Sequence, residues 1–324
     1  MRHAESINFA TREDWLAYRK DKIGASEAAI AVGLNPYQSP YELWLVKTGQ
    51  GEPDPGIEDK IAVRAGHFME PFIASLYQEE TGEALMSEGA HVVYPHKSIP
   101  YLFATPDWIT AKRKPVELKC LGDRTGMEYV KGNSNDSHFI QLQIQMACLG
   151  SDNGALAVLV GNREFVVTQF ERDDEVLSDL SELLEHFMEC VKVGTPPPAT
   201  WHESCKRAIS RRYPLDNEER ITLPDDADLA VGHLISLKEQ IKMLERDKAE
   251  LENQVRLWMA DNAYGETEAY EVSLKTQTRK NDIVVCKTPD NIKALTAAGI
   301  PFVANEDSTF RVLRHKVKKQ KKES

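Results

Sequence analysis

Two β-forming stretches joined by a short polar turn constrain this chain most, because they predict a hairpin that carries two acids and a base. The stretch TPDWITAKRKPVELKC covers residues 105–120, and AKRKP is the expected turn. Residues two apart on a strand share a face, so Glu117 and Lys119 point one way while Val116 and Leu118 point into a core. The hairpin therefore places charged side chains next to buried positions.

The acids of this hairpin suit a metal site, and a solvated hairpin is the alternative from the pattern alone. Asp107 stands before the turn, and Glu117 and Lys119 follow it. Mg²⁺ is typically held by one or two carboxylates while it keeps several waters. A nearby lysine can then orient or deprotonate an attacking water. The hairpin by itself leaves both interpretations open.

Length and hydropathy indicate a globular chain that lies outside the membrane. Its 324 residues allow two domains, and 41% hydrophobic residues is typical of a soluble protein. No run of 18 apolar residues occurs, and the opening MRHAESINFATRED has no apolar core, so we expect neither a membrane span nor a signal peptide. The expected location is the cytoplasm.

Cysteine spacing and charge exclude further classes. The five cysteines show no CxxC spacing, which argues against a zinc site, an iron-sulfur site and a disulfide framework. The net charge of -11 repels a polyanion on average, so nucleic-acid contacts require bound metal or local basic clusters. Such clusters occur at 112–114, 205–213 and 311–322, where a solvated turn or tail is the alternative.

Helical periodicity and capping residues organise the first 200 residues as an α/β domain. We expect helices over 15–34, 62–82, 137–150 and 174–194, with a break at Ile23-Gly24 and Ser26 capping the helix after it, and strands over 155–162 and 164–171. The proline run at 196–198 marks the end of this domain. The expected layout is a domain over 1–200, a linker over 201–228 and a C-terminal region over 229–324.

Glu70 is an acid within the apolar side of the expected helix over 62–82. Phe68 and Phe72 flank it in the sequence. A carboxylate is costly to bury without a cation, so this setting favours a metal ligand. An ordinary surface acid is the alternative.

The C-terminal region begins with a long helix, expected over 230–259. Eight positions of this helix follow one another at alternating steps of three and four residues, and seven of them are apolar, which predicts a coiled-coil-like seam. The eight residues are Leu234, Leu237, Ile241, Leu244, Lys248, Leu251, Val255 and Trp258. The seam is short, so packing on its own domain and packing on a neighbouring chain both stay open. Strands over 270–280 and 308–316, a short helix over 288–299 and a basic tail complete a small α+β extension.

Motifs in the first 200 residues carry a family resemblance. WLAYRKDKIGASEAA, RAGHFMEPFIA, ATPDWI, VELKC and HFIQLQIQM follow in this order, and together they resemble the YqaJ-type viral recombinases, the family of phage lambda exonuclease. The resemblance covers roughly residues 10 to 200. It implies a PD-(D/E)xK, restriction-endonuclease-like core in which a central mixed sheet is flanked by helices.

The resemblance also implies roles for the hairpin residues. Asp107 and Glu117 would hold one Mg²⁺ together with the Leu118 carbonyl, and Glu70 and Asp107 would hold a second, with Mn²⁺ as a substitute. Two such ions can stabilise the attacking and the leaving oxygen of a phosphodiester displacement. Lys119 would position the attacking water.

Other matched positions imply contacts to DNA. Gln141 matches the family's helix glutamine and joins the catalytic set, although an amide on a helix surface is the alternative. Arg19 and Ser26 match the positions that bind a 5'-terminal phosphate; a surface arginine and an N-cap serine are the alternatives. A guanidinium binds phosphate through paired N–H groups, and a helix start attracts anions.

The activity implied is a Mg²⁺-dependent 5'-to-3' exonuclease on linear double-stranded DNA. It would leave 3' single strands for a phage-type single-strand-annealing protein, in a bacterial host, with a phage or prophage origin. Family members form toroidal trimers, so a homo-oligomer is expected. The alternatives are another PD-(D/E)xK nuclease, such as an endonuclease or a RecB-type enzyme, and a non-catalytic module that binds DNA ends. The missing cysteine cluster weighs against the iron-sulfur versions of the first alternative, and cleavage of circular DNA would favour an endonuclease. The intact Asp107, Glu117 and Lys119 weigh against the non-catalytic module.

Overall fold

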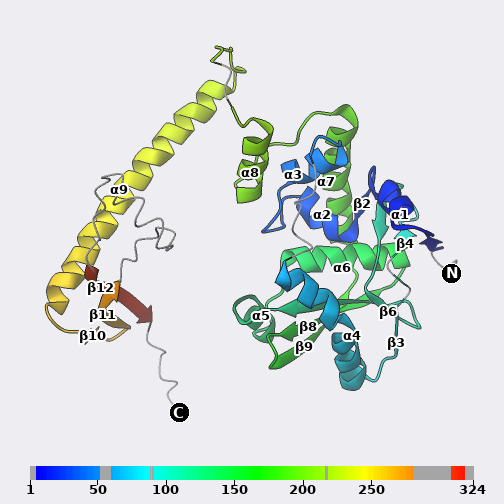
Figure 1. The fold of residues 1–324 in the computed structure, drawn as a ribbon, viewed down its shortest axis with the longest axis horizontal. Helices are drawn as coiled ribbons and strands as arrows, with labels where there is room; N and C mark the ends of the chain where they lie inside the picture. The colour runs from blue at the N-terminus through cyan, green and yellow to red at the C-terminus, as the bar shows by residue number, and fades with distance from the viewer. Residues whose placement is uncertain are drawn as a thin grey trace, which may run out of the picture. The chain divides into compact units, whose positions relative to one another are not determined.

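The chain divides into a first unit, Met1–Asn217, and a second unit, Glu218–Ser324 (Figure 1). A computed structural model describes residues 5–51, 60–87, 89, 91–215, 218–279 and 308–317. The short helix expected over 288–299 and most of the basic tail lie outside the described residues. Within the described part of the chain, no helix combines the length and apolar character needed to cross a bilayer.

A mixed sheet forms the centre of the first unit. Strands β7 and β8 run parallel, while the other neighbouring pairs are antiparallel. The strands, in spatial order, are β3 (Leu85–Met86), β6 (Trp108–Thr110), β7 (Pro115–Leu121), β8 (Asn153–Val160) and β9 (Glu164–Glu171).

The predicted hairpin is confirmed as β6 and β7. Trp108 pairs with Val116 and Ile109 with Pro115, and Arg113 in the turn has a φ of 64°. Phe103, which precedes the hairpin, belongs to strand β5 of a second sheet, and β5 ends at Ala104. Asp107 lies directly before β6, which begins at Trp108.

Helices cover both faces of the central sheet. Helix α4 (Ile61–Thr81) packs on β7 and β8, where its Ile73 and Tyr77 join Val116 and Leu118 in one buried cluster. Helix α6 (Asp136–Leu149) covers the opposite face and lies between the sheet and α2 (Ala25–Ala31) (Figure 1). Helix α5 (Asp123–Val130) packs on β8 and β9. Strand β7 is thus buried on both sides, and its alternate residues face different helices.

The rest of the first unit forms a second buried cluster around α2 and α6. It contains another sheet and a helical layer. The remaining elements are β1 (Ile7–Asn8), β4 (Val92–Pro95), β5 (Leu102–Ala104) and β2 (Ile23–Gly24), which pair in that order, and α1 (Arg12–Arg19), α3 (Pro40–Lys47), α7 (Asp174–Val193) and α8 (Glu203–Arg212).

Helix α8 lies in the stretch that the sequence assigned to a linker. Its Cys205 and Ala208 are buried in the second cluster, and α8 packs on α3. The sequence of an amphipathic helix after a proline run does not show whether the helix packs on the preceding domain. The compact unit accordingly continues to Asn217.

The second unit contains the expected long helix and a small antiparallel sheet. Helix α9 spans Ala227–Met259, and β10 (Tyr264–Glu266), β11 (Tyr270–Arg279) and β12 (Ser308–Val317) pair in that order. The seam residues Leu234, Leu237, Ile241, Leu244, Leu251 and Trp258 are each more than half exposed. The expected α/β class is confirmed, whereas coiled-coil pairing through α9 stays a prediction.

Candidate active site

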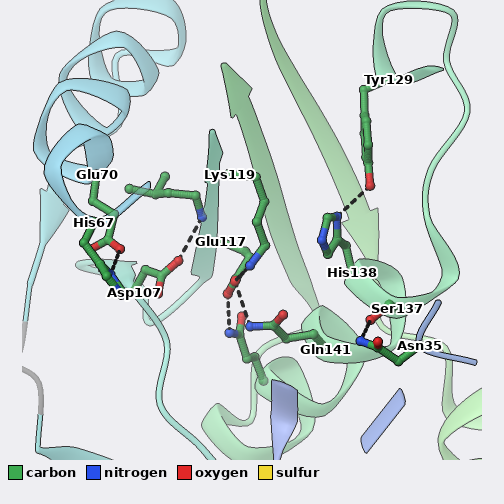
Figure 2. A network of polar contacts seen from close by, with 12 residues as sticks. Asn35, His67, Glu70, Asp107, Glu117, Lys119, Tyr129, Ser137, His138 and Gln141 are labelled. Atoms are coloured by element: carbon green, nitrogen blue, oxygen red, sulfur yellow. Dashed lines mark hydrogen bonds and ion pairs between the residues drawn. The ribbon is translucent and has the colours of Figure 1, made fainter. Parts of the chain in front are cut away.

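One pocket of about 550 Å³ in the first unit collects the residues that the sequence singled out. Its lining includes Arg19, Ser26, Glu70, Asp107, Glu117, Leu118, Lys119 and Gln141. These residues come from α1, α2, α4, the β6–β7 hairpin and α6, which are far apart in sequence. Figure 2 shows Asp107 between Glu70 on α4 and the pair Glu117 and Lys119, which lie on the central strand β7.

Glu117 is the most deeply buried acid of the pocket, with 1% of its surface exposed. The alternation of β7 turns it toward α6, away from the cluster under Val116 and Leu118. Its Oε1 accepts hydrogen bonds from Lys119 Nζ at 2.6 Å and Gln141 Nε2 at 2.7 Å. This surrounding of donors satisfies a charge that would otherwise be costly to bury.

Asp107 lies at the start of β6 and is tied to the neighbouring strand. Its Oδ2 accepts a hydrogen bond of 3.1 Å from the backbone N–H of Leu118. Burial, with the negative charge of Glu117 as a second cause, raises the pKa of Asp107 to about 8. The pocket therefore holds two carboxylates that disfavour each other's charge.

Lys119 shares the face of Glu117 on β7, and its ammonium interacts with the carboxylates of both Glu117 and Asp107. Burial opposes its ionisation, but the carboxylates of Glu117 and Asp107 outweigh burial and raise the pKa of Lys119 above its ordinary value. The side chain keeps 25% exposure, so its ammonium is charged and reaches the pocket. The predicted grouping of Asp107, Glu117 and Lys119 is what the fold brings together.

Glu70 lines the pocket, but the setting expected for it is wrong. Its side chain is 33% exposed and accepts a hydrogen bond of 2.8 Å from His67 Nδ1 when that nitrogen is protonated. Phe68 and Phe72 are 83% and 50% exposed. The buried residues of α4 are Ile73, Ala74 and Tyr77, so neither Phe68 nor Phe72 belongs to the face that packs on the sheet. Burial cost therefore does not argue for a cation at Glu70.

Arg19 reaches the pocket from the last turn of α1. Its guanidinium lies 4.4 Å from the ring centre of Trp15, and its Nη2 donates to Glu27 Oε1 at 3.3 Å. Its neighbour in the pocket, Ser26, comes from α2.

Ser26 is exposed, but it is not the N-cap residue of α2 that the sequence predicted. The N-cap of α2 is Gly24, and the backbone N–H of Gly24 donates to the Glu27 carboxylate at 2.8 Å. The glutamate three residues after the cap thus satisfies the N–H of the cap residue itself, which is the reciprocal half of a capping box.

Two features of the site were missed from sequence. Gln145 is fully buried, and its Nε2 donates to Glu117 Oε2 at 2.6 Å. It stands four residues after Gln141, so helical spacing in QLQIQ was the available signal. The hydroxyl of Tyr129 and Nδ1 of His138 share a hydrogen bond of 2.6 Å beside Lys119 (Figure 2). Burial, and then the Lys119 charge, lower the pKa of His138 to about 4, so this imidazole is neutral at pH 7.

The oxygen atoms of the pocket suit a hard divalent cation. Asp107, Glu117 and the Leu118 carbonyl offer hard oxygen ligands, which suit Mg²⁺ with retained waters. The described residues contain no group of three or more His, Cys, Asp and Glu side chains arranged to hold a metal. Glu70 stands with His67 instead of joining the other acids. The site fits one ion held by two carboxylates, and a second requires Glu70 to leave His67.

Comparison with known proteins shows which family the part of the chain that forms the site resembles. Residues 14–152 match the family model of the YqaJ-like viral recombinase domain. This range contains every candidate residue named above, and the resemblance inferred from the sequence motifs is confirmed. This part of the chain is thus similar to the YqaJ-like viral recombinase domain.

One curated protein and two solved structures illustrate what this chain is similar to. The chain is 28% identical over 270 residues to the uncharacterized protein YqaJ of Bacillus subtilis (strain 168), an alignment that covers 82% of this chain and 83% of that protein. A crystal structure of an alkaline exonuclease from Laribacter hongkongensis is 24% identical, with a TM-score of 0.48, and covers 61% of this chain and 98% of its own. A phage-related exonuclease from Haemophilus somnus 129PT is 12% identical, with a TM-score of 0.43, over 52% and 93% of the two chains.

Proposed function

We propose that this protein is a Mg²⁺-dependent exonuclease that digests one strand of linear double-stranded DNA in the 5'-to-3' direction. The 3' single strands that it leaves would serve a phage-type annealing protein in homologous recombination. The observation that carries this proposal is the meeting of Asp107, Glu117 and Lys119 in one pocket that Arg19 also lines. The YqaJ-like viral recombinase domain over residues 14–152 supports the recombination role.

The metal part of the proposal rests on the chemistry of the acids. Asp107 and Glu117 lie close enough for each to disfavour the other's charge, and only one lysine of the pocket faces them. A divalent cation would relieve this repulsion, with Asp107, Glu117 and the Leu118 carbonyl as the residues that hold it and Glu70 as the added ligand of a second ion. When bound, Mg²⁺ supplies electrophilic stabilisation of the phosphodiester and activation of water.

The protein's own groups would orient the reactants. Lys119 already donates to Glu117 Oε1 at 2.6 Å, so its ammonium lies where a water beside this carboxylate would be oriented and made more acidic. Gln141 and Gln145 hold Glu117 from the α6 side at 2.7 and 2.6 Å. These amide donors fix the carboxylate plane, since a bond to each oxygen prevents its rotation.

Direction requires a group that recognises the DNA end. A 5'-terminal phosphate carries more negative charge than an internal phosphodiester, and a guanidinium can bind it through paired N–H groups. Arg19 lines the same pocket as the acids, and Ser26 adds an exposed hydroxyl. A phosphate held there would present the adjoining phosphodiester to Asp107 and Glu117, which supports digestion from the 5' end.

The test is digestion of a linear blunt duplex that carries a label at either end, with Mg²⁺ or with EDTA. We expect loss of 5' nucleotides with Mg²⁺ and no digestion with EDTA, and no digestion of a closed circular duplex. Asp107→Ala should lose at least a thousandfold in rate, because removal of a metal ligand costs several kcal/mol of transition-state stabilisation. Cleavage of the circle would identify an endonuclease. Unchanged duplex with wild-type protein and Mg²⁺ would refute the proposal.

A second set of variants separates metal binding from catalysis. Lys119→Ala should lose digestion but retain Mg²⁺ binding in calorimetry, because the ammonium is not a ligand. Arg19→Ala should lose the preference for 5'-phosphorylated over 5'-hydroxyl ends by about ten- to a hundredfold, the value of one charge-assisted contact. Both ends must be compared at one salt concentration, since general phosphate attraction changes steeply with salt.

A further inference from the structure

Arg19 is held by an ion-pair cluster that no part of the proposed reaction uses. Lys47, at the end of α3, is 7% exposed, and its Nζ donates to Glu27 Oε2 at 2.8 Å. The same ammonium donates to the backbone carbonyl of Arg19 at 3.0 Å. Lys47 thus contacts Arg19 directly through the backbone and indirectly through the carboxylate that pairs with its side chain.

Glu27 is the shared acceptor of this cluster, and its bonds are unequal. Oε2 accepts from Lys47 and from the Gly24 N–H, at 2.8 Å each, while Oε1 accepts from Arg19 Nη2 at 3.3 Å. The shorter bonds go to Lys47 and the backbone. The Glu27 carboxylate is therefore fixed mainly by Lys47 and the Gly24 N–H, and its hydrogen bond to the Arg19 guanidinium is the longest of the three.

The aromatic rings of Trp15 and Phe103 lie near the Arg19 guanidinium and leave its N–H groups able to bind an anion. Arg19 lies 4.4 Å from the ring centre of Trp15 and 5.5 Å from that of Phe103, and both rings line the pocket. A guanidinium stacked on aromatic rings keeps its N–H groups in its own plane, where they can donate to an anion. The side chain of Arg19 is 22% exposed, so part of that edge faces the pocket.

The charges of the cluster decide whether Arg19 attracts an anion. Arg19 and Lys47 are cations and Glu27 is an anion, so the cluster carries one net positive charge. Without the Lys47 charge, Glu27 would neutralise Arg19, and the Arg19 end of the pocket would lose its attraction for phosphate. The Lys47 side chain is only 4% exposed, so water cannot readily replace it as a partner of Glu27.

We infer that Lys47 is a positioning residue for the 5'-terminal phosphate: it holds Glu27 and offsets its charge, so that Arg19 presents an unneutralised guanidinium to the DNA end. This inference rests on the proposed function and adds to it a residue that lies below the pocket and does not touch DNA. On this inference, recognition of the 5'-phosphate depends on the opposite charges of Glu27 and Lys47 as well as on Arg19.

The test is steady-state digestion of linear duplex with 5'-phosphoryl or 5'-hydroxyl ends by full-length variants. Lys47→Met should raise the KM for phosphorylated ends about tenfold, the lower value for a charge-assisted contact, while kcat at saturating DNA stays within about threefold. Adding Glu27→Gln to Lys47→Met should restore the KM to within about threefold of wild type, because the carboxylate that neutralised Arg19 is gone. A purely structural role for Lys47 predicts instead a lower stability and a change that is the same for phosphorylated and hydroxyl ends, because an uncompensated buried Glu27 would disturb the fold whatever the DNA end carries.

Two further variants keep the test decisive. Lys192→Met makes the same change in an exposed ion pair on α7 and should leave both KM values unaltered. Glu27→Gln alone keeps an amide oxygen for Lys47 or Arg19 and should retain the phosphate preference within about threefold, so it carries the test if Lys47→Met fails to fold. Digestion by wild type with a KM unchanged in Lys47→Met, or a double variant worse than the single, would overturn the inference alone. Absence of digestion by wild type would overturn the proposed function with it.

Discussion

Asp107→Asn should make the protein more stable while it abolishes digestion. The carboxyl group is only partly exposed and faces Glu117, which is why its pKa lies at about 8 instead of the ordinary 3.8. Asn keeps an oxygen that can accept the Leu118 N–H but carries no charge. The substitution therefore removes the repulsion without removing the hydrogen bond.

The sign of the pH dependence follows from proton binding. Asp107 binds its proton more tightly in the folded than in the unfolded protein, so its contribution to stability is complete below about pH 4 and is lost as the pH rises toward 8. The interval from 3.8 to about 8 corresponds to about 6 kcal/mol. Solvent at the partly exposed carboxyl reduces this to about 2–4 kcal/mol.

The assay is urea unfolding of wild type and variant in EDTA between pH 4 and 8.5. The variant should gain about 2–4 kcal/mol over wild type at pH 8.5, and the difference should vanish near pH 4. Mg²⁺ at a hundred times its Kd should stabilise wild type by about 2.7 kcal/mol and the variant much less. Asp179→Asn, on the exposed side of α7, is the matched control and should show neither effect. A constant difference across the pH range would refute the reasoning.

Two other expectations concern buried groups, and a third concerns the second unit. His138→Gln should flatten the loss of stability between pH 6.5 and 4.5 by about 2–3 kcal/mol in urea unfolding, because the unfolded chain binds a proton that the buried imidazole, with a pKa of about 4, does not. Gln145→Leu should cost about 1–3 kcal/mol and most of the digestion rate, since it leaves an oxygen of Glu117 without a donor, whereas Gln143→Leu should cost similar stability and leave digestion intact. A chain ending at Asn217 should fold and digest DNA; a folded but inactive product would show that the second unit completes the site.

Local sequence was sufficient for the hairpin because its determinants are local. The period of two in VELKC fixes which side chains share a face, and the turn residues fix the register of β6 and β7. The assignment of Asp107, Glu117 and Lys119 to one site needs little more than this register. The long helix α9 was predicted for the same reason, since a repeat of three and four residues is a property of the helix itself.

Local pattern failed where distant elements decide burial. Phe68 and Phe72 read as a core face, yet the sheet does not reach them. Ser26 was a reasonable cap by residue type, but the chain begins α2 one residue earlier, at Ala25. Helix α8 lay in a stretch without an evident partner until α3 supplied one.

The sequence by itself determined the hairpin, the chemical types at the pocket and the order of the motifs, because spacing along one strand or helix fixes those relations. Only the tertiary structure decided which partners each charge obtained. Gln145 reaches Glu117 from α6, and Lys47 reaches Glu27 from α3, across 28 and 20 residues of chain. Such contacts depend on how helices pack against the sheet and against each other, and burial then sets their strength, because a charge removed from water depends wholly on the partners that the fold supplies.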